Sequence, residues 1–135
     1  MNQSFLLITR MRKEPPTEKE LAAMSMTRSE VQDLVARLRA AQERALRSTG
    51  GGGYRVLLDY DATTHMSFSD LPVLQAANPA EAEARTRVLE TILDYDRAFF
   101  YKTLRSVAKT QLNDLQPREF VDSVQKFPPA TRPRN

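Results

Sequence analysis

The stretch YRVLLDY, residues 54–60, has the composition of a strand that is buried on both faces of a sheet. A second short apolar run, SFLLIT, occupies residues 4–9. Between them, apolar residues recur at steps of three and four over residues 28–48, which is typical of a helix. The order strand, helix, strand predicts two parallel strands joined by a crossover helix. The sequence therefore predicts the α/β class.

The crossover segment begins with two helix-start signals. Thr17 with Glu20 forms a capping box that opens a short helix after the break at residues 14–16, and Thr27 with Glu30 opens the longer helix. The apolar residues of the longer helix form one stripe, which we expect to pack on the sheet. The stripe consists of Val31, Leu34, Val35, Leu38, Ala41, Ala45 and Leu46.

The four glycines of the chain are consecutive, at residues 50–53. A phosphate-binding loop needs Lys-Ser or Lys-Thr after the glycines and then a helix. Here Tyr54 follows and a strand begins. The glycines are therefore interpreted as a helix stop and a flexible connector.

The segment after the second strand contains the single histidine, His65, within TTHMSFSDL, residues 63–71. Open parallel sheets hold their functional groups at the carboxyl ends of the strands, so this loop is a candidate site. Asn78 followed by Pro79 then starts a helix that runs to about Arg105. We expect this long, strongly apolar helix to cover a face of the sheet.

The net charge of +3 is unevenly distributed along the chain. Residues 1–101 carry 13 basic and 14 acidic side chains, whereas residues 102–135 carry 7 basic and 3 acidic ones. We divide the chain into residues 1–106 and a basic, proline-containing tail, residues 107–135, which is expected to be irregular with room for a short helix over 118–126. The basic charges are scattered and follow no binding motif, so no nucleic-acid partner is predicted.

Composition excludes several other classes of site. The chain has no cysteine, which excludes disulfides, Cys-ligated zinc and thiol catalysis, and one histidine cannot form a His-rich metal site. No metal and no cofactor are therefore predicted. No run of 18 apolar residues is present, so no membrane span is expected. The N-terminal apolar run is too short for a secretion signal, which leaves a cytoplasmic location as the default expectation.

With strand, loop histidine and closing helix in this order, the sequence resembles the C-terminal end of a serine α/β-hydrolase. THMSFSDLPVL resembles the histidine segment of platelet-activating-factor acetylhydrolase and dienelactone-hydrolase-like esterases, and His65, Phe68 and Asp70 match its His-x-x-Phe-x-Asp pattern. SFLLITR resembles the preceding core strand, and ILDYDRAFFYKTL resembles the closing helix. The resemblance spans residues 4–105. It implies an incomplete α/β-hydrolase fold: the last two parallel strands, crossover helices and a long C-terminal helix.

The resemblance implies a catalytic role for His65 as the general base that activates a serine nucleophile and returns the proton to the leaving group. It implies supporting roles for three neighbours. Phe68 would pack beside the site, and the side chains of Ser69 and Asp70 would cap backbone N–H groups of a following helical turn. The alternative, that Ser67 or Ser69 forms a local site with His65 and Asp70, requires side chains that converge, which nearness in sequence does not provide.

Most of a triad enzyme is missing from the chain. No serine lies between two glycines, so the Gly-x-Ser-x-Gly elbow is absent, and the elbow precedes the histidine in this fold. The resembled family also places its acid before the strand that matches residues 4–9. Glu14 follows that strand, where many other α/β-hydrolases hold their acid, and is a second candidate, although a solvated turn residue is the plainer interpretation.

Two functions remain open on this evidence. The first is a C-terminal fragment of an ester hydrolase that is inactive alone and needs an N-terminal hydrolase fragment as its partner, with a short acyl or lipid-like ester as substrate. The second is a non-enzymatic helical protein whose apolar stripes bind a partner or another copy of the chain. In the second case His65 would be dispensable.

Overall fold

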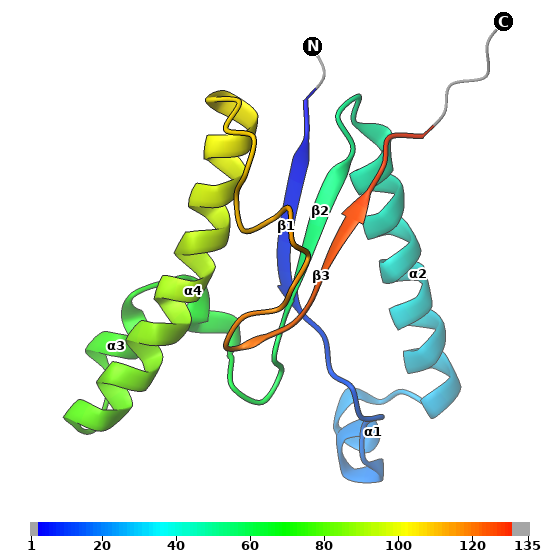
Figure 1. Ribbon diagram of the computed structural model, residues 1–135. Helices are drawn as coiled ribbons and strands as arrows, with labels where there is room; N and C mark the ends of the chain where they lie inside the picture. Colours follow the sequence, from blue (N-terminus) through cyan, green and yellow to red (C-terminus); the bar gives the residue numbers. More distant parts are fainter. Residues whose placement is uncertain (1–2, 131–135) are drawn as a thin grey trace, which may run out of the picture.

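The computed structural model describes residues 3–130, which form a small mixed sheet with helices on both faces (Figure 1). The strands are β1 (Phe5–Arg10), β2 (Gly53–Leu58) and β3 (Val121–Phe127), in the spatial order β1-β2-β3. β1 is parallel to β2, and β3 is antiparallel to β2. The predicted parallel pair is therefore confirmed, and the helices with a mixed sheet are compatible with a mixed α/β class.

The helices begin where the sequence signals predict. They are α1 (Glu18–Met24), α2 (Arg28–Ser48), the four-residue α3 (Leu71–Leu74) and α4 (Pro79–Leu104), with a 3₁₀ turn η1 (His65–Phe68) before α3. Both predicted capping boxes are present, at Thr17 and at Thr27. The Asn78 side chain accepts a hydrogen bond from the Glu81 N–H at the start of α4.

The main core lies between the sheet and α4. Tyr95 of α4 and Val56 and Leu58 of β2 are fully buried there. Residues of both outer strands complete this core, because Val121 and Val124 of β3 are buried in it and Leu6 and Ile8 of β1 pack against it. The long helix therefore covers one whole face of the sheet, as the sequence predicts.

Within residues 3–130, the C-terminal end of α2 is the helical segment that covers the opposite face of the sheet. Leu46 is fully buried there, and a Cβ atom on Gly53 would lie 2.7 Å from the Leu46 Cδ2 atom, so glycine permits this close approach. Arg55 of β2 is buried on the same face and donates hydrogen bonds to Gln125 of β3 and to Glu43 of α2. These contacts join α2 to the sheet at one end.

The prediction that the whole apolar stripe of α2 packs on the sheet is wrong. Every residue from 32 to 41 is exposed, including Leu34 and Leu38, and only Leu46 of the stripe is buried. The reason is length. A helix of 21 residues is about 32 Å long, whereas a six-residue strand spans about 20 Å. α2 therefore extends beyond the sheet, and its N-terminal half lies against no strand (Figure 1).

The short helix considered for residues 118–126 is also wrong, because this part of the tail forms β3. Val121, Val124 and Phe127 are the buried residues of β3, at intervals of three, which resembles helical spacing. A register shift opposite Leu57 and Leu58 puts one extra residue into β3. This bulge brings Val121 and Val124 to the face covered by α4. Phe127 is opposite Gly53 and lies near Arg47 and Arg55, on the face covered by α2.

None of the helices within residues 3–130 is long and apolar enough to cross a membrane.

Candidate functional site

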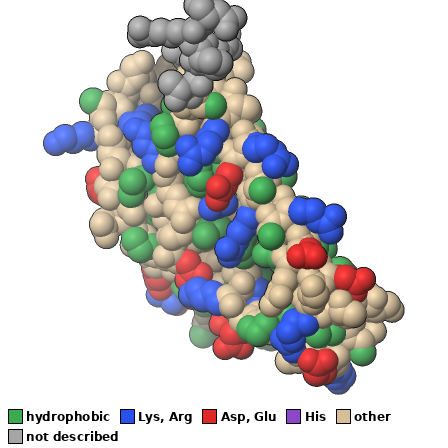
Figure 2. Space-filling view, turned by 90° about the vertical axis from the view of Figure 1, so that its right-hand side faces the viewer, with side chains coloured by type: hydrophobic (Ala, Val, Ile, Leu, Met, Phe, Trp, Pro, Cys, Tyr) green, Lys and Arg blue, Asp and Glu red, His purple; other side chains and the backbone are tan. Residues whose placement is uncertain are grey.

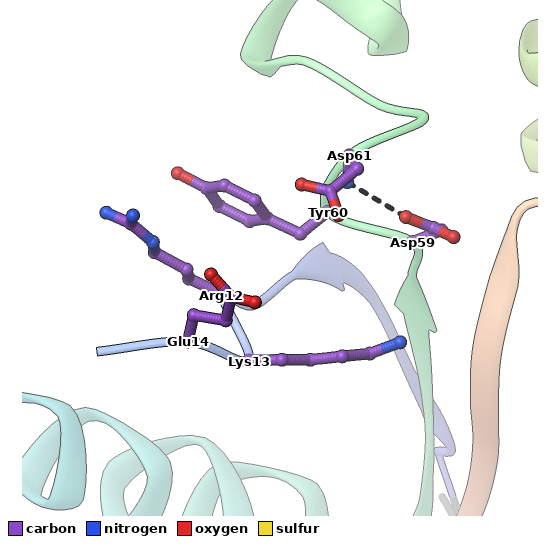
Figure 3. Close-up of a pocket in the computed structure, with 6 residues that line it drawn as sticks. All are labelled: Arg12, Lys13, Glu14, Asp59, Tyr60 and Asp61. Atoms are coloured by element: carbon purple, nitrogen blue, oxygen red, sulfur yellow. Dashed lines mark hydrogen bonds between the residues drawn. The ribbon is translucent and has the colours of Figure 1, made fainter. Parts of the chain in front are cut away.

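The carboxyl ends of β1 and β2 lie side by side and border a small cavity of about 200 Å³ (Figure 3). Because the strands are parallel, the residues that follow each strand meet at this edge of the sheet. The segment after β1 contributes three residues and the segment after β2 contributes three more. The lining residues are Arg12, Lys13, Glu14, Asp59, Tyr60 and Asp61.

Several charged side chains at this edge already have partners. Lys13 forms an ion pair with Asp122 of β3 at 2.7 Å, and this hydrogen bond raises the pKa of Lys13. Asp59 accepts hydrogen bonds from the backbone N–H groups of Ala62 and Asp61, which lower its pKa. Figure 3 shows the bond from Asp61. Glu14 is exposed and makes no side-chain hydrogen bond or ion pair within residues 3–130. At this edge Lys13 and Asp59 are therefore held by structural contacts, whereas the carboxylates of Glu14 and Asp61 have no hydrogen-bond or ion-pair partner within residues 3–130.

Arg12 ties this edge to the start of α1. Its guanidinium donates to the Glu20 carboxylate at 2.7 Å, and the Thr17 backbone N–H and hydroxyl both donate to the other Glu20 oxygen at 2.7 Å. The hydrogen bond from Arg12, followed by those from Thr17, lowers the pKa of Glu20 to about 2. The Glu20 carboxylate thus holds the segment between β1 and α1 by accepting hydrogen bonds from Arg12 and Thr17.

This arrangement predicts a specific response to acid. The folded pKa of Glu20 lies below its ordinary value of 4.5, so the stabilisation is present above about pH 4.5 and is lost as the pH falls towards 2. Arg12→Ala should raise the pKa of Glu20, measured by NMR titration of the carboxyl carbon. Glu30 is the matched control. The backbone N–H and hydroxyl of Thr27 donate to its carboxylate, as those of Thr17 do to Glu20, and Arg12 makes no hydrogen bond to it. An equal rise at both carboxylates would contradict this assignment.

His65 lies one loop beyond the carboxyl end of β2, as the first residue of η1. The loop is anchored by Thr63, which is buried and whose hydroxyl donates to the carbonyl of Asp59. The His65 side chain is exposed, does not line the edge cavity, and makes no hydrogen bond or ion pair with any residue from 3 to 130. The structure thus presents an exposed imidazole in the turn that follows the loop after β2.

The residues around His65 form a self-contained turn. The Ser67 hydroxyl accepts from the Thr64 N–H at 2.9 Å, and the Ser69 hydroxyl donates to the Met66 carbonyl at 2.9 Å. Ser69 therefore satisfies a carbonyl group, and not the N–H group that the capping prediction gave it. Asp70 occupies the N-cap position of α3, but its side chain makes no capping hydrogen bond, so its predicted capping role is also wrong.

Phe68, the expected packing residue, is 45% exposed. It lies in η1, which contacts α3 and α4, so this turn is seated on the helical layer and not in the sheet edge. Neither Ser67 nor Ser69 is hydrogen-bonded to His65, and Glu14 borders the cavity at the end of β1 without a hydrogen bond to the imidazole. Within residues 3–130, then, the structure assembles neither a Ser–His pair nor a His–carboxylate pair.

A wide apolar groove of about 940 Å³ runs between α2 and the segment that links β1 to α1. Its apolar lining includes Met24, Val31 and Val35, and Arg28 and Arg39 are among its charged residues. Figure 2 looks onto the side of the molecule that carries α2, where hydrophobic side chains lie among many lysine and arginine side chains. The sequence signal for this groove was the α2 stripe, which is longer than the sheet it was expected to cover.

The His65 imidazole is exposed, and no serine or carboxylate within residues 3–130 is hydrogen-bonded to it. No group of three or more His, Cys, Asp or Glu side chains within residues 3–130 is arranged to hold a metal ion.

No protein-family model, curated protein or solved structure matches the chain.

Proposed function

We propose that the chain is the C-terminal segment of an α/β-hydrolase and contributes a catalytic histidine, His65, to an ester-hydrolysing site that an N-terminal part completes. The observation that carries this proposal is the position of His65. It is exposed in the loop after β2, and β2 is parallel to β1 and joined to it by the crossover helix α2. Open α/β sheets hold their functional groups in loops that follow the carboxyl ends of parallel strands, and His65 lies in such a loop.

The free edge of β1 supports the need for a second part. Within residues 3–130, β1 pairs only with β2, so its other edge offers unpaired backbone N–H and C=O groups. Phe5 at the start of β1 is 45% exposed, although the strand has the composition of a buried one. An N-terminal part could add a parallel strand there, which would both extend the sheet and bring its own catalytic groups to the same edge.

In the completed site, a serine of the N-terminal part would attack the ester carbonyl. His65 would take the proton from the serine hydroxyl and then give it to the leaving alcohol, which leaves the acyl group on the serine. Water, deprotonated by His65, would then release the acid and restore the serine hydroxyl. A carboxylate would orient the imidazole and stabilise its charged form. It would come from the N-terminal part, with Glu14 as the second candidate. The substrate class is an ester, of the short acyl or lipid-like kind that the resemblance implies.

The test is a complementation assay with p-nitrophenyl acetate. The chain alone should hydrolyse this ester no faster than free imidazole at the same concentration, because it lacks both an activated nucleophile and oxyanion donors. Addition of an N-terminal hydrolase fragment that carries a Gly-x-Ser-x-Gly elbow should produce activity. Robust turnover by the chain alone, lost on Ser67→Ala or Ser69→Ala, would refute the proposal. Failure with several well-folded N-terminal fragments would also refute it.

A further inference from the structure

The exposed half of α2 has the pattern of a helix that packs against another helix. Val31, Leu34, Leu38, Ala41 and Ala45 follow one another at alternating steps of three and four, which is a seven-residue repeat. Leu38 is 54% exposed and Leu34 is 40% exposed. A single free helix gains no burial from such a stripe, so the pattern indicates a missing partner.

The shape of this surface fits a helix. A shallow hollow of about 460 Å³ lies along α2, and its apolar lining is Leu34, Leu38, Ala40 and Ala41. Its remaining lining residues are Arg37 and Arg44. The alanines at the C-terminal side let a second backbone approach closely, while the leucines at the N-terminal side project outwards. Small residues at one end and large ones at the other suit a partner that runs in the opposite direction.

The charges beside the stripe select a second copy of α2 as that partner. Glu30, Arg37 and Arg44 lie seven residues apart along one flank of the stripe. When two such helices run antiparallel, Glu30 of each copy lies opposite Arg44 of the other, which gives two ion pairs. Arg44 makes no ion pair within residues 3–130, and Glu30 uses only its Oε2 atom in the capping box, so both are free to pair.

We propose that two copies of the chain associate through an antiparallel pairing of their α2 helices. Leu34 of each copy packs against Leu38 of the other, and Val31 of each copy packs against Ala41 of the other. The Arg37 residues of the two copies lie opposite each other near the two-fold axis. The like charges of the two Arg37 side chains oppose the pairing, and Asp33, one helical turn earlier, offsets them in part. The surface is the outer side of α2, so the pairing does not depend on hydrolase activity or on the free edge of β1.

The first test is the mass of the purified chain by sedimentation equilibrium over a wide range of concentrations. The chain should approach twice its monomer mass as the concentration rises, and Leu38→Glu should weaken the association roughly tenfold or more. Leu104→Glu is the matched control, because Leu104 is even more exposed and lies at the end of α4. A chain that is monomeric throughout would overturn the proposal, because the stripe would then bind some other partner. A dimer that Leu38→Glu leaves intact would also overturn it.

The second test determines the direction of the helices. The chain has no cysteine, so a single introduced cysteine can be crosslinked only to the same cysteine in a second copy of the chain. Arg37→Cys should crosslink efficiently with a short bis-maleimide reagent, because this position lies near the two-fold axis. Arg44→Cys should not, because antiparallel pairing separates the two copies of this position by about 20 Å along the helix. Equal crosslinking at both positions would contradict the antiparallel arrangement.

Discussion

His65→Ala is expected to lower the ester hydrolysis of the complemented enzyme by about 10²–10⁴-fold, the range in which a general acid–base group contributes. The expected loss is large because the imidazole would act twice, first as the acceptor of the serine proton and then as the donor to the leaving alcohol. The measurement is the initial rate of p-nitrophenyl acetate hydrolysis after the N-terminal fragment is mixed with saturating amounts of each variant.

Met66→Ala is the control for this prediction. Met66 follows His65 in η1, its side chain is also exposed, and only its backbone carbonyl accepts a hydrogen bond in this turn. Its rate should stay close to that of the unchanged chain. Because the His65 side chain is exposed and has no partner within residues 3–130, His65→Ala should change the free energy of unfolding by no more than about 0.5 kcal/mol. An unchanged rate for His65→Ala would remove the histidine from the mechanism.

The parallel pair could be predicted because its signals are local. The apolar runs of β1 and β2 are short and uninterrupted, and the capping box at Thr27 fixes the start of α2 to the residue. The place of His65 in the loop after β2 follows from the same information, although its position on the helical layer does not. Whether the imidazole has partners could not be predicted, because side chains distant in sequence must converge for a site to form.

β3 was missed for a different physical reason. A strand with one buried face shows apolar residues at every second position, whereas Val121, Val124 and Phe127 are three apart. The spacing becomes intelligible only with the bulge at β2 and with the change of face between Val124 and Phe127, and neither can be read from the tail alone. Proline and basic residues nearby strengthened the impression of an irregular segment.

The extent to which α2 packs on the sheet was overestimated, although its apolar periodicity was read correctly. The periodicity of the stripe was correct, but periodicity shows only that a helix has an apolar face and not what covers that face. With six-residue strands, the sheet ends before the helix does, and Leu34 and Leu38 are left exposed. The exposed stripe therefore results from the length of α2 relative to the strands.

Leu58→Ala is expected to lower the free energy of unfolding by about 2–5 kcal/mol. Leu58 is the last residue of β2, is fully buried, and lies in the core between the sheet and α4. It pairs with Val121 at the bulge, so the lost methyl groups would leave a cavity where three elements meet. A domain of this size is stabilised by about 5–15 kcal/mol, so the loss would be a large fraction of the total.

Leu104→Ala is the control that separates the effect of burial from the effect of deleting the same atoms. Leu104→Ala deletes the same atoms from a side chain that is 76% exposed, and it should change the free energy of unfolding by about 0.5 kcal/mol or less. Urea unfolding followed by circular dichroism gives both values, provided that the slope with urea is unchanged. Because dimerisation adds to apparent stability, both substitutions should be made in the Leu38→Glu background. Equal losses at Leu58 and Leu104 would contradict the core described here, since the difference rests on burial alone.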